Sequence, residues 1–162
     1  MRRPVVLAAL FLAAIVLANW VTNRYGFVTV APGLDATAGT FAAGATLTIR
    51  DALQDRAGRW PVLVLVVIGA AVSALVSPTL GLASGVAFLA AEAADFAVYT
   101  PLRARSWDLA VWASAAVGAV ADTALFLWLA FGTLTAEGVT GQVVGKLEAT
   151  LVVWWLLRRW RP

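Results

Sequence analysis

Several ionisable side chains stand within long apolar segments of the sequence, where a polar group needs a partner or a function. Glu92, Asp95, Tyr99 and Arg103 follow the spacing i, i+3, i+7 and i+11, which places all four on one face of a helix. At a helix centre in a bilayer, one charged group costs about 2.5–3.5 kcal/mol on insertion scales. We therefore expect these groups to face one another or a wet cavity rather than lipid.

Two later segments carry a small or polar residue at every fourth position, a pattern that lets helices approach closely. These residues are Ser114, Gly118 and Asp122 in one segment, and Gln142, Lys146 and Thr150 in the other. Acids outnumber Lys146, the single cation expected at membrane depth, so unpaired carboxylates must bind a proton or find another donor. A cargo rich in N–H groups or a transported proton would supply one. The simpler interpretation, that the charges only neutralise one another, stays open.

The elements that must position these residues are membrane-spanning helices. Of the 162 residues, 62% are hydrophobic and 13% are charged, and the mean hydropathy is +0.86. A spanning helix needs about 20 mostly apolar residues. The sequence predicts one all-α transmembrane domain, residues 1–162, with six spans: about 4–21, 27–49, 61–78, 81–102, 108–131 and 140–158. The second span is the weakest, because it contains Pro32-Gly33 and Asp35.

The arginines predict the orientation, because short loops rich in Arg and Lys stay in the cytoplasm. If the N-terminus is inside, Arg24 alone falls outside, and all others fall inside: Arg2, Arg3, Arg50, Arg56, Arg59, Arg103, Arg105, Arg158, Arg159 and Arg161. Both termini are then cytoplasmic. This topology orders the polar residues from outside to inside: first Asn19, Asp35, Gln142 and Lys146, then Glu92 and Asp122, and finally Asp95, Tyr99 and Arg103.

Composition also excludes several kinds of chemistry. The chain has no Cys and no His, which removes disulfides, thiol nucleophiles and every Cys- or His-based metal site. No nucleophile–base or metal constellation is visible, so we expect no enzyme activity, no metal and no cofactor. The net charge of +3 comes from arginines that flank apolar runs, which indicates contact with the bilayer surface rather than with nucleic acid.

Five motifs, in order along the chain, carry a family resemblance. They are Ala18-Asn19, Thr48-xx-Asp51-xxx-Asp55-xx-Gly58-Arg59, Glu92-xx-Asp95-xxx-Tyr99-xx-Leu102-Arg103, Ser114-xxxxxxx-Asp122-xxx-Phe126 and Gly141-Gln142-xxx-Lys146. Together they resemble the queuosine precursor transporter family, also called the vitamin uptake transporter family. The resemblance implies a six-helix carrier of the inner membrane that imports 7-cyano-7-deazaguanine or 7-aminomethyl-7-deazaguanine.

Such a cargo suits the polar residues. A deazaguanine presents N1–H and a 2-amino group side by side, which one carboxylate can accept, and a 6-oxo group that needs a donor. We expect the substrate to bind at Asn19, Asp51, Glu92, Asp95, Tyr99, Asp122, Gln142 and Lys146. Asp35 and Arg103 are expected to serve structure or gating. For Asn19, a helix cap or an interhelical hydrogen bond is an equal alternative.

Two other functions stay open. The chain could be the substrate-binding subunit of an energy-coupling-factor vitamin transporter, or a non-transporting membrane protein whose buried acids only aid packing. The sequence leaves open whether the chain forms a homo-oligomer and whether transport is coupled to a proton, carried by Asp122 or Glu92, or runs downhill.

Overall fold

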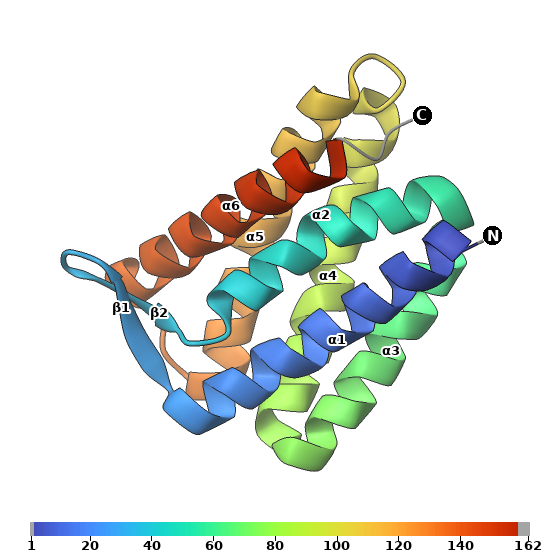
Figure 1. The fold of residues 1–162 in the computed structure, drawn as a ribbon. Helices are drawn as coiled ribbons and strands as arrows, with labels where there is room; N and C mark the ends of the chain where they lie inside the picture. The colour runs from blue at the N-terminus through green and yellow to red at the C-terminus, as the bar shows by residue number, and fades with distance from the viewer. Residues whose placement is uncertain (1, 159–162) are drawn as a thin grey trace.

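Six helices and one short hairpin make up the part of the protein that the structure describes (Figure 1). The computed structural model describes residues 2–158. Along the chain the elements are α1 (Arg2–Tyr25), β1 (Phe27–Ala31), β2 (Leu34–Thr37), α2 (Thr40–Ala57), α3 (Arg59–Val76), α4 (Pro78–Leu102), α5 (Trp107–Phe131) and α6 (Ala136–Arg158). The expectation of six helices is confirmed.

Four of these helices are long and apolar enough to cross a membrane. They are α1, from Pro4 to Tyr25, and the whole of α3, α4 and α5. Helices α2 and α6 fall short because polar residues interrupt them, among them Arg50 and Asp51 on α2 and Lys146 and Glu148 on α6. Crossing by all six helices, with both termini in the cytoplasm, stays a prediction.

The expected helix over residues 27–49 is wrong in its first half. Residues 27–37 form an antiparallel hairpin in which Phe27 pairs with Thr37 and Ala31 with Leu34. Pro32-Gly33 makes the turn, and Gly33 has φ +72°, which matches a type II turn with proline before a glycine of positive φ. The helix therefore starts at Thr40 and extends to Ala57, eight residues beyond the expected end.

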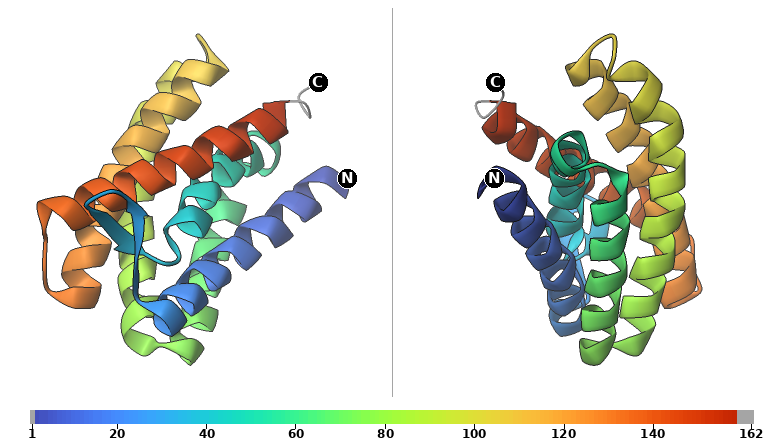
Figure 2. Two further views of the ribbon diagram at one scale, coloured as in Figure 1. Left: turned by 60° about the vertical axis from the view of Figure 1, so that its left-hand side comes forward. Right: turned by 90° about the vertical axis from the view of Figure 1, so that its right-hand side faces the viewer.

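Helix α2 lies inside the bundle, where it contacts α1, α3, α5 and α6 (Figure 2). Eleven of its 18 residues are buried, whereas only four of the 18 residues of α3 are. The apolar α3 therefore presents most of its surface outward, as a lipid-facing helix does. The more polar α2 is shielded by protein, which is where lipid-embedded structures tolerate polar groups.

Close approach of α2 to α6 depends on Gly44. A Cβ atom at this position would lie 2.5 Å from the Cα of Lys146, far inside van der Waals contact. Small residues at such crossings are the usual means of packing helices in membranes. The contact holds Lys146 in the interior, next to α2.

The two ends of the bundle differ. The first residues of α1 and the last described residues of α6 lie at one end, and the hairpin lies at the other, beside the start of α6 (Figures 1 and 2). In the predicted orientation, the hairpin end is the outer one.

Candidate substrate cavity and buried ion network

A small cavity of about 30 Å³ lies toward the hairpin end of the bundle, between α1, α2, α4, α5 and α6. This space holds roughly two water molecules, so a heterocyclic cargo requires the surrounding helices to move apart. The aromatic rings of Phe88 and Phe126 contribute to its wall. Its polar lining includes Asn19, Thr22, Ser84, Asp122, Gln142 and Lys146.

Lys146 forms an ion pair at the cavity wall. Its Nζ donates to Asp122 Oδ2 at 2.6 Å and to Thr123 Oγ1 at 2.7 Å. Lys146 is 1% exposed and Asp122 is 8% exposed. A buried charge of either sign is costly unless paired, so each of these two residues supplies the partner that the other needs.

Two amides of the cavity differ in how they are satisfied. The Nδ2 of Asn19 lies within hydrogen-bond distance of three acceptors, the carbonyl of Ile15 and the hydroxyls of Ser73 and Ser84, all at 3.1–3.2 Å. Asn19 thus links α1 to α3 and α4. The Nε2 of Gln142 is buried and has no hydrogen-bond partner among the described residues. An unsatisfied buried donor beside a cavity is suited to an acceptor on a ligand.

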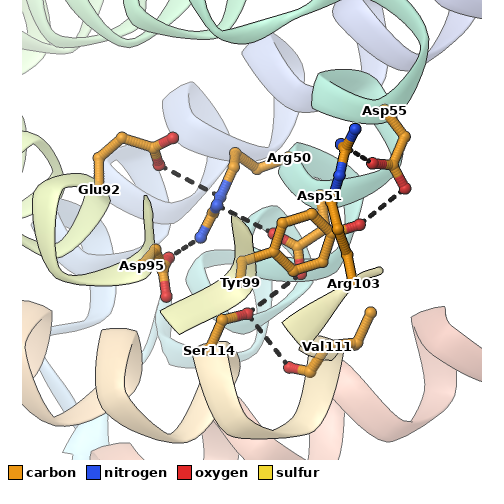
Figure 3. A network of polar contacts seen from close by, with 9 residues as sticks. All are labelled: Arg50, Asp51, Asp55, Glu92, Asp95, Tyr99, Arg103, Val111 and Ser114. Atoms are coloured by element: carbon orange, nitrogen blue, oxygen red, sulfur yellow. Dashed lines mark hydrogen bonds and ion pairs between the residues drawn. The ribbon is translucent and has the colours of Figure 1, made fainter. Parts of the chain in front are cut away.

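A second polar group lies deeper in the bundle, centred on Arg50 (Figure 3). Its Nη1 is 3.0 Å from Asp51 Oδ1, its Nε is 3.2 Å from Glu92 Oε2, and its Nη2 contacts Asp95 Oδ2. All four side chains are 1% exposed. Ser114 of α5 donates to Asp51 Oδ2 at 3.4 Å. We call Arg50, Asp51, Glu92 and Asp95 the Arg50 network.

Asp55 extends this polar group toward the end of the bundle where α1 begins. The hydroxyl of Tyr99 donates to Asp55 Oδ2 at 2.7 Å, and Arg103 pairs with Asp55 Oδ1 at 2.5 Å. Arg103 is 44% exposed at its side chain and Asp55 is 27% exposed. This pair therefore meets water, unlike the Arg50 network (Figure 3).

The structure divides the expected substrate-binding residues into two groups. Asn19, Asp122, Gln142 and Lys146 line the cavity. Asp51, Glu92 and Asp95 belong to the Arg50 network, with Tyr99 beside it. Asp51, Glu92 and Asp95 each contact Arg50. The single site expected from the sequence is therefore two adjacent sites. Whether any of these residues binds cargo stays a prediction.

The structure places Asp35 on the hairpin and not within a helix. Asp35 lies on β2, is exposed, and accepts a hydrogen bond of 2.8 Å from Thr29 on the paired strand. The cause is the hairpin, which carries Asp35 out of the helical interior. Its backbone packs against Gly141 at the start of α6, and its expected role in structure or gating stays a prediction.

Sequence reasoning missed Arg50. Its place after an expected span end at residue 49 assigned it to the cytoplasmic surface, and Lys146 was taken as the single buried cation. The longer α2 instead places Arg50 in the middle of a helix, 1% exposed. The signal was the Pro-Gly turn, which shifts the helix toward higher residue numbers and moves Arg50 inward.

Comparison with known families identifies the second half of the bundle. Residues 75–159, more than half of the chain, match the family model described as "Putative vitamin uptake transporter". The chain belongs to this family. The matched region contains Glu92 and Asp95 of the Arg50 network and Asp122, Gln142 and Lys146 of the cavity. No curated protein and no solved structure matched the chain. Membership in the vitamin uptake transporter family indicates a multi-pass membrane protein that takes up a small molecule.

Proposed function

We propose that the protein is a carrier of the inner membrane that imports a 7-deazaguanine precursor of queuosine, with its binding site in the cavity. The observation that carries this proposal is the cavity itself. It combines a carboxylate, an ammonium group and an unsatisfied amide donor with two aromatic side chains, in a member of an uptake transporter family. The family resemblance of the motifs supplies the class of cargo.

The chemistry of the cavity suits a guanine-like heterocycle. Asp122 can accept from the adjacent N1–H and 2-amino groups, and a bidentate, charge-assisted contact of this kind is strong. The unpartnered Nε2 of Gln142 can donate to the 6-oxo group. Phe88 and Phe126 provide apolar faces for the ring system. The donors and acceptors of the cavity are thus complementary to those of the cargo.

Gln142→Met is the sharpest test of this site. Because Nε2 has no partner within the described protein, the substitution removes no internal hydrogen bond from it and keeps a side chain of similar length. Loss of one hydrogen bond to a neutral cargo costs about 0.5–1.5 kcal/mol, so we expect binding to weaken by roughly 2- to 12-fold. Titration calorimetry on the purified protein with 7-cyano-7-deazaguanine measures this, with guanine and biotin as competing candidates.

The control is Glu148→Gln, a substitution on an exposed position of the same helix, which should leave affinity unchanged. Equal affinity of the wild type and Gln142→Met for 7-cyano-7-deazaguanine would refute the placement of the 6-oxo group. Tight binding of biotin without binding of the deazaguanine would refute the cargo class. The alternative of an energy-coupling-factor subunit predicts binding as well, and transport by the chain alone distinguishes it.

A further inference from the structure

The charges of the Arg50 network do not balance. One guanidinium faces the carboxyl groups of Asp51, Glu92 and Asp95, so full ionisation would leave a net charge of −2 in a region that is 1% exposed. The other buried cation among the described residues, Lys146, is paired with Asp122 at the cavity. Unbalanced buried charges are very costly, and carboxyl groups in such places bind protons instead.

The hydrogen-bonding pattern indicates which carboxyl groups lack compensation. Asp51 forms an ion pair with Arg50 and accepts a hydrogen bond from the hydroxyl of Ser114. In contrast, Glu92 Oε1 and Asp95 Oδ1 are buried oxygens with neither a hydrogen bond nor an ion pair in the part of the chain that the structure describes. Figure 3 shows one oxygen of Glu92 joined to Arg50 and the other without a marked contact.

Apart from Arg50, the surroundings of Asp95 offer little to stabilise a charge. Both of its carboxyl oxygens lie against Gly118 of α5, where a Cβ atom would be 2.9 Å away from each. The remaining charged groups nearby are Asp55 of α2 and Arg103 of α4, which pair with each other, and Tyr99 of α4 donates to Asp55. Among residues 2–158, no cluster of acids has an arrangement that could hold a metal ion. A proton bound to a carboxyl group would reduce the excess negative charge of the network.

The network adjoins the cavity along two helices. On α4, Ser84 and Phe88 line the cavity, and Glu92 and Asp95 occupy the next turns. On α2, Thr46 lines the cavity and Arg50 follows one turn later. The network therefore lies between the cavity and the end of the bundle where α1 begins.

We propose that Glu92 and Asp95 bind the protons that couple to cargo uptake, at a site separate from the cargo cavity. This inference rests on the proposed carrier function. With both groups protonated, Arg50 and Asp51 balance each other, and the side chains that join α2 to α4 carry no net charge. Release of a proton leaves an excess negative charge, which is relieved when the two helices separate and admit water. Proton release is thus linked to opening of the inner end.

Infrared spectroscopy tests the proton site without any cargo. The purified wild type should show the C=O stretching band of protonated carboxyl groups at neutral pH, and the double variant Glu92→Gln/Asp95→Asn should lose it. The amide side chains of this double variant imitate the protonated forms of Glu92 and Asp95, so we expect the fold to be retained. Because Glu148 is exposed in the middle of α6, Glu148→Gln is introduced into both the wild type and the double variant, and it should leave the band of Glu92 and Asp95 unchanged. Absence of the band in the wild type, or its persistence in the double variant, would overturn the proposal.

Transport in liposomes tests the coupling. With the external side acidic, the wild type should accumulate labelled 7-cyano-7-deazaguanine against its gradient, and a trapped pH dye should report proton entry. The double variant should exchange labelled for unlabelled cargo but lose the response to the pH gradient. Exchange by the wild type that ignores the pH gradient, or that a sodium gradient drives instead, would contradict proton coupling. No exchange at all would contradict the carrier function, and the infrared result would still decide the proton site.

Discussion

At the scale of single residues, two buried cations determine how the polar interior is arranged. Lys146 pairs with one carboxylate at the cavity, and Arg50 contacts three carboxyl groups deeper in the bundle. Removing one partner of a buried ion pair usually costs about 3–5 kcal/mol, whereas replacing both by apolar groups is often neutral. The contribution of an ion pair to stability must therefore be measured with a variant in which both partners are replaced, as well as with the single variants.

The pair of Lys146 and Asp122 should show strong coupling. Lys146→Met alone leaves Asp122 as a buried, unpaired acid, and we expect the free energy of unfolding to fall by about 3–5 kcal/mol. The double variant Lys146→Met/Asp122→Leu should recover most of that loss. Thermal unfolding of the purified variants gives the coupling from a double-mutant cycle. Additive effects of the two changes would show that the ion pair contributes nothing to the fold.

The sequence predicted the residues of the site better than their partners. Asn19, Gln142 and Lys146 were expected in the outer half and Asp122 nearer the midplane, and all four line one cavity. Their spacing identified a helix face, and the topology fixed their depth. The partner of Glu92 and Asp95 could not be found in this way, because Arg50 follows an apolar run and looks like a cytoplasmic flank until the start of α2 is known.

At the scale of elements, α2 is the helix on which the two sites depend. It contributes Thr46 to the cavity and Arg50 and Asp51 to the network, and it crosses α6 at Gly44. The ends of α3, α4 and α5 fall close to the predicted spans, since these helices are apolar enough to be recognised by hydropathy and end at turn or cap residues such as Ser106 and Gly132. Helix α2 faces protein, so hydropathy alone could not locate it.

Gly44→Ala tests the crossing of α2 and α6. In an unobstructed helix, alanine is more favourable than glycine by about 1 kcal/mol. Here the added Cβ would overlap the backbone of Lys146, and overpacking of this kind typically costs about 1–3 kcal/mol. We therefore expect a lower unfolding temperature and weaker cargo binding. A rise in the unfolding temperature would show that the two helices do not approach as closely as described.

At the scale of the whole molecule, the outstanding point is how the six helices lie relative to the membrane. Four are long and apolar enough to cross it. If α2 also crosses, the hairpin and the loop between α4 and α5 lie on opposite sides. If α2 does not cross, they lie on the same side. The arginine distribution favours the first arrangement, even with Arg50 removed from the cytoplasmic set.

Single cysteines can decide between these arrangements, because the chain has no cysteine of its own. Pro32 in the hairpin turn and Arg105 in the loop between α4 and α5 are both exposed. In intact cells, a membrane-impermeant maleimide should label Pro32→Cys, and it should label Arg105→Cys only after the membrane is opened. The cysteine-free wild type is the control. Labelling of both variants in intact cells would contradict six spans.

The most direct test of the carrier function is exchange transport by the purified chain alone. Liposomes loaded with unlabelled 7-cyano-7-deazaguanine should take up the labelled compound faster than empty liposomes, with no ATP and no second protein present. Gln142→Met should slow the exchange at cargo concentrations below saturation, and Glu148→Gln should not. Binding of the cargo without any exchange would contradict the account and would favour a substrate-binding subunit that needs an ATPase partner.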